Sequence, residues 1–178
     1  MSWVVRGPEQ PLSKLEKKLY TRVRRELWDY EPLRASHAEV FIDVTGQHVG
    51  LRGRVRTMPQ KIIAEMLVRR MSDVGSVSNL LIADPEVIRQ VADALAQDAR
   101  TAPYVIRVDA RHGIVILRGE VPGQAIADAA AEIAASVPIV MSVRNHLSIG
   151  GAEQPSIALA RPASTADVAN LDATPVRA

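Results

Sequence analysis

The sequence contains no cysteine, only 3% aromatic residues and no long apolar run. Without cysteine there can be no disulfide framework, zinc–cysteine site, iron–sulfur cluster or thiol nucleophile. No segment approaches the roughly 18 apolar residues of a membrane span, and the first residues lack the apolar core of a signal peptide. The 178 residues, 47% of them apolar, suit one or two globular domains held together by packing. We therefore expect a cytoplasmic protein that does not cross a membrane.

The chain repeats itself at a constant spacing of 66 residues. Residues 40–83 align with 106–149 without a gap, and 12 of the 44 aligned pairs are identical. The clearest matches are Leu51–Val55 with Leu117–Val121, and Ser76–Leu81 with Ser142–Leu147. Such self-similarity predicts two tandem copies of one structural unit.

Hydrophobic periodicity predicts the elements of each copy. Apolar residues recur every four positions at Leu15, Leu19, Val23 and Leu27, and again at Val87, Val91 and Leu95, as expected for an amphipathic helix. Alternating apolar residues then predict a hairpin of two strands over 40–55, with a polar turn at 45–48. A second helix follows, with Ile62, Ile63, Met66 and Leu67 facing inward, and then a strand that holds Val77, Asn79 and Leu81.

These elements predict an α+β fold made of two tandem αββαβ domains. In each, two helices cover the apolar face of a three-stranded mixed sheet, because a sheet with one apolar face must be covered. We expect domain 1 over residues 12–82 and domain 2 over 83–149. Residues 1–11 are predicted to be a flexible arm, and 150–178, rich in Ala, Pro, Ser and Thr, a disordered tail.

Two repeated polar or small residues have structural interpretations. Gly53 and Gly119 lie on the core face of a strand, where a missing side chain would let a helix approach the sheet closely. Asn79 and Asn145 point inward, so their amides need hydrogen-bond partners, which we expect on a hairpin or loop backbone.

The repeated motifs resemble the BON domain, a small bacterial module. The pattern V-x-L-x-G-x-V stands at 49–55 and 115–121, and V-x-N-x-L at 77–81 and 143–147. The resemblance covers roughly residues 14–149. It implies binding rather than catalysis, with attachment to phospholipid membranes or components of the cell envelope.

Charge is distributed unevenly between the copies. Residues 12–82 contain 13 Lys and Arg against 8 Asp and Glu, whereas 83–149 contain 6 against 8. On a helical wheel, one cluster of the first helix faces away from its apolar stripe. Its members are Lys14, Lys17, Lys18, Arg24, Arg25 and Trp28. A tryptophan among cations suits an anionic bilayer surface, so we predict anionic-surface binding here. The alternative is a solvated face, with Trp28 covered by the following loop.

A second basic feature alternates along the predicted strand at Arg52, Arg54 and Arg56 and projects from its open face. The same face carries Phe41, Leu80 and Ile82. This mixture favours packing between the two copies or between chains, with phosphate contact as the alternative. It does not favour nucleic acid, because no exposed aromatic residues alternate with the arginines to form a stacking platform.

No motif for catalysis, metal or cofactor binding is found. The four histidines have neither equivalent repeat positions nor metal-ligand spacing, and no nucleotide-binding or nucleophile motif occurs. We expect no catalytic residues, no metal and no cofactor. The sequence predicts a non-enzymatic adaptor, peripheral at an anionic phospholipid membrane surface. The alternative is a structural scaffold subunit, as a homo-oligomer or with a protein partner, that holds an assembly through its open sheet faces.

Overall fold

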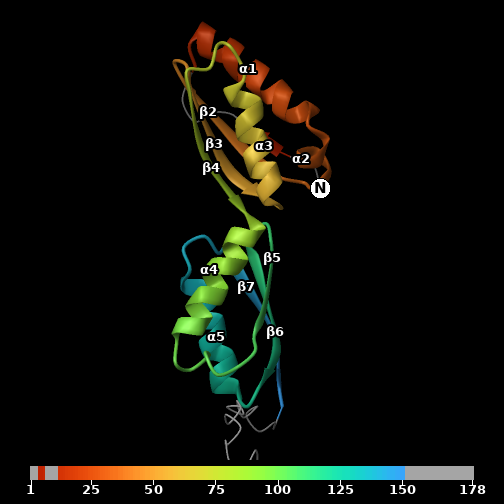
Figure 1. The fold of residues 1–178 in the computed structure, drawn as a ribbon, viewed down its shortest axis with the longest axis vertical. Helices are drawn as coiled ribbons and strands as arrows, with labels where there is room; N and C mark the ends of the chain where they lie inside the picture. Colours follow the sequence, from red (N-terminus) through yellow and green to blue (C-terminus); the bar gives the residue numbers. More distant parts are fainter. Residues whose placement is uncertain (1–3, 7–11, 151–178) are drawn as a thin grey trace, which may run out of the picture.

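The computed structural model describes residues 4–6 and 12–150, which form two α+β domains placed end to end in an elongated molecule (Figure 1). The elements of the first domain are β1 (Val4–Arg6), α1 (Lys14–Asp29), α2 (Glu31–Ala35), β2 (Glu39–Thr45), β3 (His48–Val55), α3 (Met58–Arg69) and β4 (Ser76–Ala83). Those of the second are α4 (Asp84–Gln97), β5 (Arg107–Arg111), β6 (Ile114–Val121), α5 (Gln124–Ser136) and β7 (Ser142–Ile149).

The two domains share one sheet topology, which confirms the tandem αββαβ fold. The hairpins β2–β3 and β5–β6 are antiparallel, and β4 and β7 then pair parallel to β3 and β6. The second sheet has the three predicted strands, in the order β5-β6-β7. The first has four, in the order β1-β2-β3-β4.

The fourth strand corrects the predictions for the first sheet and for the N-terminal arm. Val4–Arg6 pairs in parallel with Glu39–Phe41, so this part of the predicted arm 1–11 is a strand. It covers the outer edge of β2, which would otherwise expose unpaired backbone groups. The rest of the arm, and the predicted tail beyond Gly150, lie outside the described residues.

Helix α1 begins at a well-formed cap. The Ser13 side chain accepts a hydrogen bond from the Glu16 N–H, and the Glu16 carboxylate accepts one from the Ser13 N–H, which forms a capping box. Leu19, Val23 and Leu27 are buried as predicted. Leu15 is not: its side chain is 73% exposed, since this first turn lines a surface hollow instead of the core.

The buried face of α3 matches the predicted one only in part. Leu67 packs partly buried against the core as predicted, but Ile62 and Met66 are exposed, and the fully buried residues are Gln60, Ala64 and Val68. The helix is held in this rotation by Asn79, whose amide nitrogen donates a 2.9 Å hydrogen bond to the Lys61 carbonyl oxygen. The small Ala64 side chain also lets α3 lie close to the sheet.

Asn79 and Asn145 are clamps between strand and helix, not between strand and loop. Asn145 donates a 2.8 Å hydrogen bond to the carbonyl oxygen of Ala127 in α5, the counterpart of the bond from Asn79 to Lys61. In both copies the asparagine oxygen accepts a hydrogen bond from the N–H two residues later. The structural interpretation is therefore right, but the predicted partner is wrong: each asparagine amide donates to a helix carbonyl oxygen rather than to a hairpin or loop.

The repeated glycines face the backbone of the neighbouring strand, or of the segment just before it, rather than a helix. Gly53 has φ +123°, and a Cβ at this position would clash with the carbonyl oxygen of Glu39 in β2. Gly119 has φ +142°, and its Cβ would lie 2.6 Å from the carbonyl oxygen of Val105. Only glycine combines this backbone conformation with such close strand contact. The predicted approach of a helix is thus wrong.

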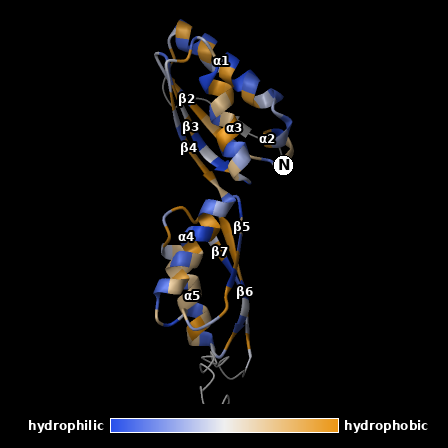
Figure 2. Ribbon diagram, viewed as in Figure 1, coloured by the Kyte–Doolittle hydropathy of each residue, from blue (hydrophilic) through white to orange (hydrophobic). Residues whose placement is uncertain are grey.

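The helices lie on opposite sides of the sheets in the two domains. In Figure 1, α1 and α3 lie to the right of the first sheet, whereas α4 and α5 lie to the left of the second. The open sheet faces therefore point in opposite directions and do not pack on each other within the chain. In Figure 2, hydrophilic and hydrophobic residues alternate along α1. Among the described helices, none has the length and apolar character needed to cross a bilayer.

Candidate functional site

The predicted anionic-surface residues lie together on the outside of α1. We call this cluster the basic face of α1; its residues are Lys14, Lys17, Lys18, Arg24, Arg25 and Trp28. All six side chains are exposed. Within residues 4–6 and 12–150, none of its five cations forms an ion pair. The structure thus brings together every residue that sequence reasoning assigned to this surface.

Two acidic residues of α1 are engaged away from the basic face. The Glu16 carboxylate accepts a 2.8 Å hydrogen bond from the Gly46 N–H in the β2–β3 turn, and Glu26 pairs with Arg70 at 3.2 Å. The bond from Gly46, with those from Ser13, holds the pKa of Glu16 below its usual value. These carboxylates therefore do not neutralise the basic face.

Trp28 is not covered by the following loop. Its side chain is 42% exposed and, with Thr21, Arg24 and Arg25, it lines a shallow hollow of about 300 Å³. Arg34 in α2 donates a 3.4 Å hydrogen bond to the Trp28 carbonyl oxygen. The indole is thus accessible from outside the domain at one end of the basic face.

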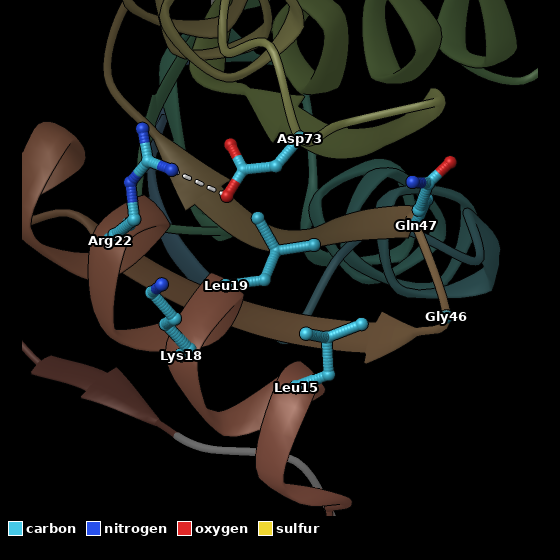
Figure 3. A pocket seen from close by; sticks show the side chains of 7 residues that line it. All are labelled: Leu15, Lys18, Leu19, Arg22, Gly46, Gln47 and Asp73. Carbon is cyan, nitrogen blue, oxygen red and sulfur yellow. Dashed lines mark hydrogen bonds and ion pairs between the residues drawn. The ribbon is translucent and has the colours of Figure 1, made fainter.

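A second hollow of about 300 Å³ lies at the other end of α1 (Figure 3). Leu15 and Lys18 of the helix flank it, opposite Gly46 and Gln47 of the β2–β3 turn. Arg22 closes one side through a 2.6 Å ion pair with Asp73. Exposed Leu15 thereby adds apolar surface beside the lysines of the basic face.

Arg52 and Arg54 of β3, and Arg56 just after it, do not form a free ladder. Arg52 binds Asp43 on β2, with its Nη2 2.7 Å from the Asp43 carboxylate. The equivalent pair in the second copy, Arg118 and Asp109, forms the same ion pair across β5 and β6. These pairs link the two strands of each hairpin on the open sheet face, so Arg52 has a structural role.

Arg54 joins the two domains. Its Nη1 donates a 2.8 Å hydrogen bond to the carbonyl oxygen of Ile139, which precedes β7. The guanidinium also packs on Gly113 in the β5–β6 turn, where a side chain of any size would collide with it. The structure therefore places this arginine at a contact between the two copies.

Other contacts fix the same junction. Strand β4 ends at Ala83 and α4 begins at Asp84, so no linker separates the domains. Lys61 of α3 pairs with Glu86 of α4 at 2.8 Å. Burial raises the pKa of Glu86, but hydrogen bonds from Lys61 and the Ala83 N–H outweigh it and leave the pKa below its usual value.

Asp84 is the buried acid of the junction, at 6% exposed. Its carboxylate faces the backbone N–H groups of His112 and Gly113 in the β5–β6 turn, and Arg56 lies within electrostatic range. Burial nevertheless raises the pKa of Asp84 above its usual value. Its contacts tie the start of α4 to the second sheet.

A groove of about 550 Å³ opens beside this junction. Arg56 contributes one wall from the first domain, and the open face of the second sheet forms the rest. We call it the junction groove; its lining residues are Arg56, Asp109, Ala110, Arg111, His112, Ile114, Ile116, Arg118 and Arg144. Sequence reasoning assigned the open faces of the sheets to packing between copies or chains, but it did not find this groove or its arginines, because the second copy as a whole carries more acidic than basic residues. The signal that could have found it is the alternation of Arg107, Asp109 and Arg111 along one strand face.

Within the described residues, no group of three or more His, Asp or Glu side chains is placed to hold a metal ion. The surfaces described above are rich in arginine, lysine and apolar residues, so they can bind anions.

The sequence matches the model of the BON domain twice, over residues 13–85 and 83–151. The chain belongs to the BON domain family. Its two matches meet at the β4–α4 junction, so this is a tandem BON-domain protein. BON domains are typically binding modules rather than catalysts. Among curated proteins, none matches the chain.

Two solved structures show the same fold at low sequence identity. Both are of CdsD, a structural protein of the type III secretion system of Chlamydia trachomatis, the second being its C-terminal domain. They share 18% and 16% of residues with this chain, at a TM-score of 0.57 each. The matches cover 74% and 78% of this chain, but only 61% and 66% of those chains. This likeness is one of fold.

Proposed function

We propose that this tandem BON-domain protein is a non-enzymatic adaptor that attaches to anionic phospholipid surfaces through the basic face of α1. The observation that carries the proposal is the exposed indole of Trp28 among five cations that have no ion-pair partner in the described residues. An indole prefers the headgroup region of a bilayer, since its ring is apolar and its N–H polar.

Each cation of the basic face adds to the free energy of binding to the membrane surface. Each Lys or Arg close to an anionic surface contributes about 1 kcal/mol at physiological ionic strength. Five cations and one indole therefore support reversible, salt-sensitive binding. The apolar side chain of Leu15, next to Lys14, extends the same contact toward the start of the helix.

Attachment of this kind is peripheral, because α1 would lie along the membrane surface rather than cross it. We place it at the cytoplasmic face, where anionic lipids give the leaflet its negative surface potential. Fractionation of cells, with the membrane pellet washed in high salt, tests this location: a salt-released pool supports it, and a pool that only detergent releases contradicts it.

Vesicle co-sedimentation tests the lipid partner. The full chain should sediment with vesicles containing phosphatidylglycerol and stay in the supernatant with pure phosphatidylcholine. Reversing three charges, as Lys17→Glu, Arg24→Glu and Arg25→Glu together, should weaken binding at least tenfold, about 1.4 kcal/mol. The matched control reverses three charges elsewhere, at Arg56, Arg111 and Arg144, and should bind like the wild type. Equal loss in both variants would contradict the proposal.

Fluorescence identifies the surface that touches the lipid. The chain has two tryptophans, so Trp3→Phe leaves Trp28 as the only indole. Its emission should shift to shorter wavelength when anionic vesicles are added, because the ring moves from water into the headgroup region. Vesicle binding without any change in emission would show that another surface makes the contact.

A structural role in a protein assembly is the second candidate. It is favoured by the open face of the first sheet, where Leu80 is 62% exposed, and by the fold shared with a structural protein of a secretion apparatus. This role predicts a stable oligomer or a co-purifying protein that is indifferent to lipid. Light scattering of the purified chain tests it, with Leu80→Arg expected to reduce any oligomer to the monomer.

A further inference from the structure

The junction groove has the charge and shape of a binding site for an anionic ligand. Four arginines and one aspartate are among its lining residues. Arg118 is paired with Asp109, and Arg56 lies within electrostatic range of Asp84. Arg111 and Arg144 are exposed and have no acidic partner among residues 4–6 and 12–150. The groove therefore has guanidinium groups available for carboxylates, which they can bind through two parallel hydrogen bonds.

The floor of the groove is apolar. Ile114 and Ile116 lie on the open face of β6, next to Asp109 and Arg111 of β5. A ligand that fills the groove must therefore present apolar groups to the floor and anionic groups to the arginines. An extended peptide does so readily, because successive side chains of a strand point to opposite sides.

The groove is preformed by the junction. Arg56 belongs to the first domain, yet the direct β4–α4 connection, the Arg54 bond to Ile139 and the Lys61–Glu86 pair hold it over the second sheet. Its volume of about 550 Å³ lies within the range of roughly 300–1,000 Å³ common for ligand sites. Neither domain alone would provide the complete lining.

We propose that the junction groove binds an acidic, extended segment of a partner protein. Charge complementarity selects the acidic side chains, and the isoleucine floor selects apolar residues between them. Nucleic acid fits less well, since no Phe, Tyr or Trp lines the groove to stack with bases. This site is separate from the basic face of α1, so an adaptor with both surfaces would connect a partner protein to a membrane.

Fluorescence anisotropy tests the proposal with the full chain and a short fluorescein-labelled peptide of alternating Glu and Leu. The wild type should bind it, and the triple variant Arg56→Glu, Arg111→Glu and Arg144→Glu should bind at least tenfold more weakly. The charge-matched control, Lys17→Glu, Arg24→Glu and Arg25→Glu, should stay within twofold of the wild type. A peptide of alternating Glu and Gly should bind more weakly than the Glu–Leu peptide, because it lacks contacts with Ile114 and Ile116.

Several results would overturn the proposal. The first is that the wild type does not bind the peptide, and the second is that the two triple variants lose peptide binding equally. The third is that the Glu–Gly peptide binds as tightly as the Glu–Leu peptide, and the fourth is that the groove variant alone loses binding to vesicles. The milder Arg144→Gln, checked by circular dichroism for an intact fold, must also weaken peptide binding measurably. If it binds like the wild type, the proposed contact is absent. The lipid proposal is tested by vesicle binding of the α1 variant, and the groove proposal by peptide binding of the groove variant. Either proposal can therefore fail without the other.

Discussion

Arg54 in the first domain and Ile139 in the second are joined by a hydrogen bond of 2.8 Å from the arginine Nη1 to the isoleucine carbonyl oxygen. The two residues are 85 positions apart. The arginine is partly buried against Gly113, so this bond is shielded from water more than a surface contact. The bond connects the two BON domains directly across their junction.

Arg54→Ala should loosen the junction. We expect a loss of about 1 kcal/mol in the free energy of unfolding, the usual contribution of one hydrogen bond. Amide exchange should also accelerate at Met141, whose N–H donates to the Gly113 carbonyl oxygen beside the arginine. Urea unfolding and hydrogen exchange measure the two effects. As a control, Arg69→Ala removes an exposed pair within α3 and should cost less than about 0.5 kcal/mol.

Gly53→Ala should be among the most damaging single substitutions. The added Cβ would meet the Glu39 carbonyl oxygen in a backbone conformation that L side chains rarely adopt. We expect a loss of more than about 2 kcal/mol, measured by thermal or urea unfolding. Gly46→Ala separates the two causes, because Gly46 also has a positive φ, +58°, but open space around it. It should cost about 1 kcal/mol, and equal losses at the two positions would contradict the steric argument.

The two asparagine clamps should differ in strength. Asn79 makes three hydrogen bonds, including one to Glu65 at 3.1 Å, and is half-buried. Asn145 makes two and is exposed. We therefore expect Asn79→Ala to cost about 1–3 kcal/mol and Asn145→Ala less than about 1 kcal/mol. Urea unfolding of both variants checks the order, and a larger loss at Asn145 would show that burial does not decide it.

Asp98, at the end of α4, should titrate at unusually low pH. The side chain of Arg100 donates to its carboxylate, as does the Arg100 N–H, and together they lower the pKa of Asp98 to about 2. The pair therefore stabilises the fold above the ordinary aspartate pKa, near 4, and this contribution is lost as the pH falls toward 2. Carboxyl NMR shifts measure the pKa directly. Arg100→Gln should raise it toward 4, and an unchanged value would exclude the Arg100 side chain as the cause.

The repeat made the architecture predictable from the sequence. The two aligned copies have the same order of helices and strands. A helix or strand predicted in one copy is therefore supported by the same prediction in the other. Strand β1 has no such support: only three residues long, it lies outside the repeated region. β1 pairs with the free edge of β2, and that edge exists only in the folded sheet, so the sequence pattern does not reveal it.

Periodicity predicted that α3 is a helix but not which side is buried. Ile62 and Met66 are more apolar than Gln60, so the sequence favours the wrong face. The Gln60 side chain is buried because it caps the helix start and donates a 2.8 Å hydrogen bond to the Pro32 carbonyl oxygen. The cap is a local contact, but the bond to Pro32 is a tertiary one, which only the folded chain brings about.

The candidate surfaces were predictable to different degrees. The basic face of α1 follows from a helical wheel, because all its residues belong to one helix. The junction groove combines Arg56 with side chains of three strands in the other domain, so its charge is concealed in a domain total that is slightly acidic. The net charge of a domain does not predict the charge of one of its surfaces when the fold places acidic and basic residues on different faces.

The strand that covers β2 has no counterpart on β5 among the described residues, so the second sheet ends in a bare edge. Such an edge can recruit a strand from another molecule and start aggregation. Here β5 is only five residues long, against seven for β2, and carries arginines at both ends, Arg107 and Arg111. Short edge strands that carry charged residues are poor templates for pairing with another chain, so these two features protect the uncovered edge of β5.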